Sequence, residues 1–341
     1  MCFLAALIFI ISIYFFHEEE EEILNKEQSA SQINNPIESK KGQVQKKATE
    51  GLSLFIGKSS NEVLKQFGEP VRKDPSSYGY EWWIYSDQVE QYMQVGVQNG
   101  KVVSIYGLGE ELNVAPFAIG QPIDQLFQTV NLETTIDIDW RGNSYRFELS
   151  EEDLGMRPLV KMSNGYAQVY IDKFTGKVSS VRFMDVDTLI KQRPYELVYR
   201  GELPTEEVIS EEEWKLIQDG DDQQIFDITN IVRERFNLNP LEWDEPTSEV
   251  AFKHSMDMFT DNYFSHESPK YGDLGNRLEK DHVKFELAGE NIAAQYVDGV
   301  AAFEGWLNSK SHREALLNEE FTHLGVGVYQ KYYTQNFIKK P

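Results

Sequence analysis

Two stretches of the chain resemble each other, and this internal repeat constrains the fold more than any other feature. FIGKSSNEVLKQFGEP (55–70) and FAIGQPIDQLFQTVNL (117–132) each join an Ile-Gly pair to a polar capping position and then to apolar residues at helical spacing. Alternating segments follow each stretch and end in similar hairpins, QNGKVVSIY (98–106) and FTGKVSSVRF (174–183). The repeat therefore predicts a duplicated domain of helix plus antiparallel strands over residues 51–200.

The beginning of the chain predicts a membrane anchor or signal segment at residues 1–16. The apolar run CFLAALIFIISIYFF (2–16) is followed directly by HEEEEE. The run is shorter than the roughly 20 residues of a spanning helix and has no preceding Lys or Arg. A buried core helix is the alternative, but a soluble domain rarely begins in this way. Residues 17–50 are rich in Glu, Lys, Gln, Ser and Asn, which predicts a disordered spacer.

Charge and cysteine content exclude several classes of protein. The net charge of −23 argues against a nucleic-acid or anionic-membrane surface, because no basic stripe offsets phosphate charge. The single cysteine, Cys2, excludes a disulfide within the chain. Residues 201–223 are strongly acidic, which is typical of a solvated hinge or of the exposed face of a helix. We expect an acidic linker there, followed by a last domain at residues 224–341.

The last domain combines helical patterns with two terminal strand-like segments, which predicts an α-β-α layered sandwich. It contains five short motifs in order: LNPLEWDE (238–245), NYFSHESP (262–269), GENIA (289–293), W-x-x-S-x-x-H-R (306–313) and GVGV (325–328). In these motifs the domain resembles the CAP superfamily of cysteine-rich secretory, antigen 5 and pathogenesis-related 1 proteins. Residues 51–200 resemble the domain that often precedes a bacterial CAP domain. The resemblance thus implies an α+β protein of two folded domains.

The resemblance also implies a polar cleft built from residues that lie far apart in the chain. Family members gather two histidines and usually two glutamates in a central cleft. His266 matches the first histidine, Glu290 the first glutamate and His312 the second histidine. Ser309 stands where animal and plant members have the second glutamate, so the set of four is incomplete here.

Four further residues are assigned supporting or structural roles. We expect Arg277 to pair with a carboxylate and hold the loop, and Asn291 to bond backbone groups in a turn. His254 lies on the apolar side of its predicted helix and is interpreted as a core histidine with its hydrogen bonds satisfied. Trp306 is likewise expected in the core.

The cleft residues are compatible with more than one chemistry. His266, Glu290 and His312 form a reasonable ligand set for a divalent metal such as Zn²⁺, whose bound water could drive hydrolysis. Without a metal the same groups could act as a general acid–base pair or orient a polar ligand. A purely structural hydrogen-bonded cluster is the alternative. No HExxH, GxSxG or cysteine–histidine pair indicates a protease.

Three functions follow as hypotheses. The first is a membrane-tethered or secreted protein of a Gram-positive-type cell envelope that binds a ligand or a metal without catalysis; its partner would be an unknown lipid, peptide or envelope protein. The second is a metal-dependent hydrolase of peptide or envelope material. The third is an interaction scaffold that captures a protein through the sheet of the duplicated domain.

Overall fold

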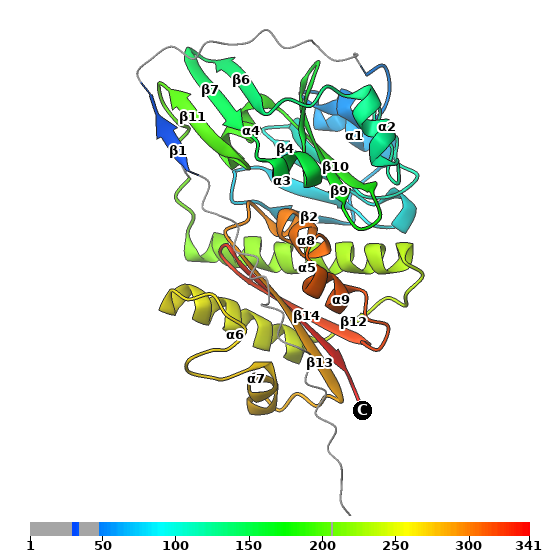
Figure 1. Ribbon diagram of the computed structural model, residues 1–341, viewed down its shortest axis with the longest axis vertical. Helices are drawn as coiled ribbons and strands as arrows, with labels where there is room; N and C mark the ends of the chain where they lie inside the picture. The colour runs from blue at the N-terminus through cyan, green and yellow to red at the C-terminus, as the bar shows by residue number, and fades with distance from the viewer. Residues whose placement is uncertain (1–28, 34–47, 206) are drawn as a thin grey trace, which may run out of the picture.

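The N-terminal domain is built on a seven-stranded antiparallel sheet (Figure 1). The computed structural model describes residues 29–33, 48–205 and 207–341. The sheet has the order β2-β3-β4-β5-β10-β9-β8. Its strands are β2 (Arg72–Pro75), β3 (Glu81–Tyr85), β4 (Met93–Gln98), β5 (Lys101–Gly107), β8 (Leu159–Met162), β9 (Gly165–Asp172) and β10 (Lys177–Met184). The helices of the domain are η1 (Leu52–Phe55), α1 (Ser60–Phe67), η2 (Val89–Gln91), α2 (Ile123–Thr129), α3 (Glu151–Met156) and α4 (Val186–Gln192).

The arrangement of this sheet agrees with the repeat in the sequence. The hairpins β4–β5 and β9–β10 meet at the centre, where β5 pairs with β10. Strands on either side then follow in mirrored order, β3 beyond β4 and β8 beyond β9. Both hairpins carry a register shift, at Gly96/Val97 and at Val178/Ser180. Each half is preceded by one of the helices that begin the two repeated stretches, α1 or α2.

A second sheet of this domain includes residues predicted to be disordered. Its order is β1-β11-β7-β6, with β1 (Ala30–Gln32), β11 (Glu196–Arg200), β7 (Asn143–Glu148) and β6 (Thr135–Trp140). Strand β1 pairs with β11 in parallel, so the prediction of a disordered spacer over 17–50 is wrong at residues 30–32. Backbone hydrogen bonds hold this edge strand in place. Such bonds form whatever the side chains are, so the polar composition of the segment did not reveal the strand.

The predicted membrane segment, residues 1–16, lies outside the described residues. Across the described ranges 29–33, 48–205 and 207–341, no helix has both the length and the apolar character needed to cross a bilayer.

The acidic segment after the N-terminal domain is helical over its second half. Helix α5 (Glu211–Arg235) begins inside the predicted linker, residues 201–223. Ser210 and Glu213 form a capping box, and the glutamates of the first turn interact favourably with the positive end of the helix dipole. Ile217 is buried, so this part of α5 packs against the rest of the protein instead of forming a free hinge.

The C-terminal domain is an α-β-α sandwich, as the sequence predicts. Its sheet has the order β12-β14-β15-β13. The strands are β12 (Glu242–Trp243), β13 (Leu287–Ala294), β14 (His323–Tyr329) and β15 (Tyr332–Lys339), and the helices that follow α5 are α6 (Glu245–Asp261), α7 (Leu274–Lys280), α8 (Gly299–Leu307) and α9 (Lys310–Leu316). Helices α5, α8 and α9 cover one face of the sheet, and α6 and α7 cover the other (Figure 1).

Two glycines allow helix α6 to lie directly on the sheet. A Cβ atom at Gly325 would overlap backbone atoms of Ser248, and one at Gly327 would overlap backbone atoms of Phe252. The GVG motif is therefore the surface on which α6 rests. Hydroxyl groups reinforce the contact, because Ser248 Oγ donates to Val326 O (2.6 Å) and Ser255 Oγ donates to Gly327 O (2.7 Å).

The two domains share one hydrophobic core. Trp82 and Tyr106 of the seven-stranded sheet belong to the same buried cluster as Ile228 of α5 and Phe303 of α8. The opposite face of that sheet, including Trp83, packs against η1, α1 and α2. Because both faces are covered, the domains form one packed body and the sheet offers little open surface to a partner protein.

Candidate functional site

The three residues predicted to converge do so in the C-terminal domain. His266 lies in the loop after α6, Glu290 on β13 and His312 on α9. His266 Nδ1 lies 2.9 Å from Glu290 Oε1. The imidazole rings of His266 and His312 are stacked, with centroids 6.2 Å apart and planes inclined by 28°. The sequence motifs therefore meet at one place, with the two imidazoles side by side and the carboxylate behind His266.

The Glu290 carboxylate is held by several donors. Arg277 on α7 donates to Oε2 through Nη2 and to His266 O through Nη1 (2.7 Å), so this arginine fixes both the carboxylate and the loop. Asn336 on β15, with its amide nitrogen turned toward Glu290, donates to Oε2 at 3.0 Å. Burial alone would raise the pKa of Glu290, but the His266 hydrogen bond and the Arg277 charge outweigh it and lower this pKa to about 2.

Ser309 supports the second histidine of the cleft. Its Oγ lies 2.8 Å from Nδ1 of His312. Both side chains are buried, and within the described part of the chain Nε2 of His312 has no hydrogen-bond partner. Burial, together with the nearby His266, lowers the pKa of His312 to about 4, so the ring is neutral at pH 7. The serine thus orients the imidazole through Nδ1, and Nε2 is the ring nitrogen without a partner in the described part of the chain.

His254 belongs to this site, although its sequence position indicates only a core residue. It is 1% exposed, as a core residue should be, and Nε2 lies 3.1 Å from Ser265 O. The prediction that its hydrogen bonds are satisfied is wrong for Nδ1, which has no hydrogen-bond partner among the described residues. A carbonyl oxygen only accepts, so Nε2 carries the proton. The same nitrogen lies 3.8 Å from Glu290 Oε1, and burial lowers the pKa of His254 to about 4. Spacing along α6 could not reveal this contact, because the packing of α6 on β14 and β15 creates it.

Asn291 and Trp306 connect the cleft to the core. Asn291 lies within strand β13, not in a turn as predicted, because residues 287–294 pair fully with β15. Its Nδ2 donates to His312 O (3.1 Å) and so ties α9 to the sheet. Trp306 is fully buried, and its Nε1 donates to Ile292 O (2.9 Å). Asn336, which contacts Glu290, has no signal in the sequence that distinguishes it from other buried strand residues.

The hypothesis of a metal bound by His266, Glu290 and His312 together does not fit this geometry. Both oxygens of Glu290 already accept hydrogen bonds, one from His266 and one from Arg277. Within the described part of the chain, no three His, Cys, Asp or Glu side chains converge closely enough to hold a metal ion. Catalytic zinc sites use about three protein ligands. His266, Glu290 and His312 therefore do not form a site for a metal-bound water.

Comparison with known proteins decides the family. The family model of the CAP-associated N-terminal domain matches residues 56–195, and that of the cysteine-rich secretory protein family matches residues 226–338. An uncharacterised membrane protein of Bacillus subtilis strain 168, YlbC, is 53% identical over 312 residues, which are 92% of this chain and 90% of the relative. The chain belongs to the CAP family.

Two solved structures share the fold of this CAP protein over nearly its whole length. An extracellular protein with an SCP domain from Bacillus anthracis is 49% identical, with a TM-score of 0.82 over 89% of this chain and 100% of that one. A cysteine-rich secretory protein from Staphylococcus aureus is 28% identical, with a TM-score of 0.76 over 87% and 98% of the two chains. The predicted family and fold class are both confirmed. Known CAP relatives therefore combine the same two domains as this chain.

Proposed function

We propose that this CAP protein is a binding protein of the bacterial cell envelope, and that its cleft binds a polar group of a ligand without chemical conversion. The observation that carries the proposal is the buried Nε2 of His312, which has no partner among the described residues. A buried polar atom without a hydrogen bond costs roughly 1–3 kcal/mol. A ligand that bonds to this nitrogen would recover that free energy.

The carboxylate beside the imidazoles supports binding over catalysis. A general base works best when its pKa is near the operating pH. Glu290 has a pKa of about 2 and is neutralised by Arg277, so it is a weak base at pH 7. His312, with a pKa of about 4, is also a weak base. The Glu290–Arg277 pair instead holds the His266 loop in place for a ligand.

The proposed location outside the cell follows from two observations. One relative is named a membrane protein and another an extracellular protein, and both match nearly the whole chain. The apolar run at residues 2–16 would supply the attachment or export signal. Recovery of the mature protein in the cytosol after cell fractionation would contradict this location.

The binding function is tested by identifying the small molecules that co-purify with the protein. The full chain is expressed in a Gram-positive host, recovered from the membrane fraction and denatured, and the released small molecules are identified by mass spectrometry. We expect a species that accompanies the wild type but not His312→Ala. His323→Gln is the control, because that histidine lies at the start of β14 and its ring faces Glu242 instead of Glu290. Identical profiles for all three proteins would contradict a ligand at His312.

A further inference from the structure

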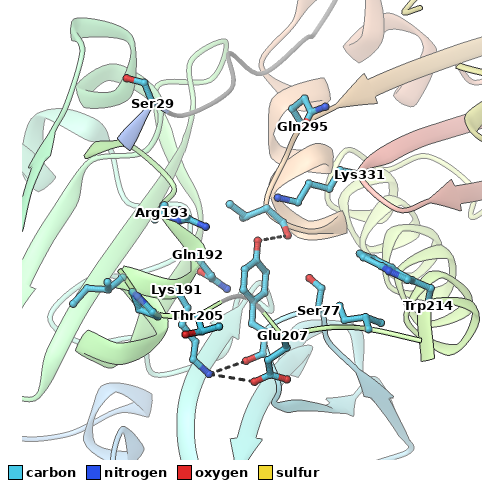
Figure 2. Close-up of a pocket in the computed structure, with 15 residues that line it drawn as sticks. Ser29, Ser77, Lys191, Gln192, Arg193, Thr205, Glu207, Trp214, Gln295 and Lys331 are labelled. Atoms are coloured by element: carbon cyan, nitrogen blue, oxygen red, sulfur yellow. Dashed lines mark hydrogen bonds and ion pairs between the residues drawn. The ribbon is translucent and has the colours of Figure 1, made fainter. Parts of the chain in front are cut away.

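Polar groups are paired differently in two cavities of the structure. In a cavity of about 430 Å³ between the two domains, wall residues bond to one another (Figure 2). There Lys191 Nζ donates to Tyr78 O (3.3 Å), and Tyr78 OH donates to Val297 O (3.0 Å). A cavity of about 380 Å³ lies within the CAP domain, between helix α6, the loop after it and helix α7. This α6–α7 cavity is lined by side chains that have polar atoms without partners.

The α6–α7 cavity is distinct from the histidine cleft. Its lining includes neither imidazole of the cleft, His266 or His312, and all of its lining residues belong to the described range 207–341. His254 and Arg277 connect the two places, because both line the cavity and both contact the Glu290 carboxylate. These two side chains are therefore neighbours at the inner end of the cavity.

Each of these two buried side chains has one polar atom without a hydrogen-bond partner among the described residues. The atoms are Nδ1 of His254, which is 1% exposed, and Nε of Arg277, which is 5% exposed. The remaining nitrogens are bonded, Nε2 of His254 to Ser265 O and the Nη atoms of Arg277 to Glu290 and to Gly272 O. Buried polar groups are nearly always paired in native proteins. Two unpaired atoms beside one cavity therefore indicate a partner from outside the chain.

The two atoms require opposite hydrogen-bond partners. Nε2 of His254 carries the ring proton, so Nδ1 presents a lone pair and accepts. Burial lowers the pKa of His254 to about 4, which keeps the ring neutral at pH 7. Nε of Arg277 carries a hydrogen and only donates. A group that satisfies both atoms must donate one hydrogen bond and accept another. A hydroxyl or an amide does so, whereas a carboxylate only accepts and an ammonium only donates.

The charged side chains of the lining already have partners. Ion pairs join Lys253 to Asp281 (2.8 Å), Lys270 to Asp257 (3.7 Å) and Arg277 to Glu290. Lys280 Nζ instead lies 3.8 Å from the centroid of the Tyr271 ring, a cation–π contact. An ionic ligand would have to compete with these contacts for its counter-charge. The lining therefore favours a neutral ligand.

The rest of the lining suits an apolar body. Val250 of α6 is buried, while Met256 and Tyr271 expose 38% and 41% of their surface. An apolar ring in the cavity would remove part of that exposed surface from water, which favours binding. Pockets for small molecules commonly combine apolar walls with a few polar groups that fix orientation. The α6–α7 cavity has both components.

We propose that the α6–α7 cavity binds a small neutral organic molecule that carries a hydroxyl or an amide group. This group donates to Nδ1 of His254 and accepts from Nε of Arg277. The apolar part of the molecule lies against Met256 and Tyr271. The site does not depend on the ligand proposed for His312.

The test is an NMR titration of the full chain with probes that share one aromatic ring. Benzyl alcohol carries a hydroxyl and benzamide an amide, whereas benzoate only accepts, benzylammonium only donates and toluene does neither. The protein is kept in an amine-oxide detergent, which has no hydroxyl or amide. We expect benzyl alcohol or benzamide to bind about tenfold more tightly than the other three, which is roughly the effect of one good hydrogen bond. The nitrogen signal of His254 Nδ1 should shift on binding, and comparison of the two neutral probes identifies the preferred group.

Two variants test the two parts of the site. In His254→Gln the amide nitrogen can still reach Ser265 O, but no acceptor remains at the position of Nδ1, so binding should weaken about tenfold. Tyr271→Ala removes an apolar wall at an exposed position and should weaken binding about threefold or more. Phe259→Ala is the matched control for Tyr271→Ala, because Phe259 is 40% exposed on α6 and lies outside the lining.

A third variant separates the cavity from the cleft. A probe bound in the cleft would lose a contact in His312→Ala, whereas a probe in the α6–α7 cavity would not. Circular dichroism should show the variants folded; if His254→Gln does not fold, Tyr271→Ala and the shift of the Nδ1 signal decide. The proposal is overturned if neither neutral probe binds, if an ionic probe or toluene binds equally well, if the folded variants of His254 and Tyr271 bind unchanged, or if only His312→Ala loses binding.

Discussion

Arg182 of the N-terminal domain and Asp298 of the CAP domain pair across the domain boundary, with 2.8 Å between Nη2 and Oδ1. Both are buried, and Arg182 is fully shielded from solvent. Asp298 is also the N-cap of α8, where Oδ1 accepts from Ala301 N (3.0 Å). The residue that caps the start of α8 in the CAP domain thus also accepts a charged hydrogen bond from Arg182 of the N-terminal domain.

Removal of this arginine should destabilise the whole protein. Arg182→Ala leaves the Asp298 carboxylate buried without its counter-charge, and breaking a buried pair typically costs about 3–5 kcal/mol. Urea unfolding followed by both fluorescence and circular dichroism should report one transition at a lower midpoint. Arg141→Ala is the matched control, since its pair with Asp187 is exposed and should contribute under about 1 kcal/mol. Two separate transitions in the variant would mean that the pair joins domains that are stable independently.

The close union of the two domains was not predictable from the sequence. The acidic composition of residues 201–223 indicates contact with water, and several of those carboxylates are exposed. The apolar positions of that segment are few, so the burial of Ile217 depends on tertiary contacts that no local pattern encodes. The Arg182–Asp298 pair joins residues separated by 116 positions, for which charge alone suggests no partner.

The cleft was more predictable, because its motifs carry family-specific order and spacing. These motifs led to His266, Glu290 and His312 as neighbours, and the structure brings the three together. The motifs could not show whether Glu290 is a metal ligand or a carboxylate already hydrogen-bonded to Arg277. The difference depends on which donor reaches each of its two oxygens. The motifs also missed His254, which reaches Glu290 only because Gly325 and Gly327 let α6 lie close to the sheet.

The two buried histidines should make the protein less stable as the pH falls from neutral. His254 and His312 have pKa values of about 4 in the folded protein, below the ordinary value of 6.5. Between these two pH values the unfolded chain binds more protons, so stability is full above pH 6.5 and falls toward pH 4. Each residue can contribute up to about 3 kcal/mol.

Titration of the histidine ring signals by NMR tests this expectation directly. The His254 and His312 signals should still report neutral rings at pH 5.5, where an unperturbed imidazole is mostly protonated. Midpoints near 6.5 for both buried rings would remove the basis for the neutral His312 on which the proposed ligand contact depends.

The Ser309 hydroxyl should stabilise one orientation of the His312 ring. Ser309→Ala removes the hydroxyl that lies 2.8 Å from Nδ1 and should cost about 1–2 kcal/mol in unfolding free energy. The serine is the N-cap of α9 but makes no side-chain capping bond, so the helix itself should be unaffected. Ser311→Ala is the control, because its Oγ lies 3.4 Å from the same nitrogen and the side chain is exposed. Equal losses in both variants would argue against a specific role for Ser309.

Glu290→Gln should cost about 3 kcal/mol at pH 7, because it removes the counter-charge of the buried Arg277 while keeping the shape of the side chain. The folded-state pKa of Glu290 is about 2 and lies below its ordinary value of 4.5. Its contribution is therefore present above pH 4.5 and is lost as the pH falls toward 2. The stability difference between wild type and variant should shrink over that range in denaturant unfolding.

Glu267→Gln, at the exposed neighbour of His266, should leave stability within about 0.5 kcal/mol of wild type. A difference that stays constant from pH 7 to pH 3 would mean that Glu290 acts through packing and not through its charge.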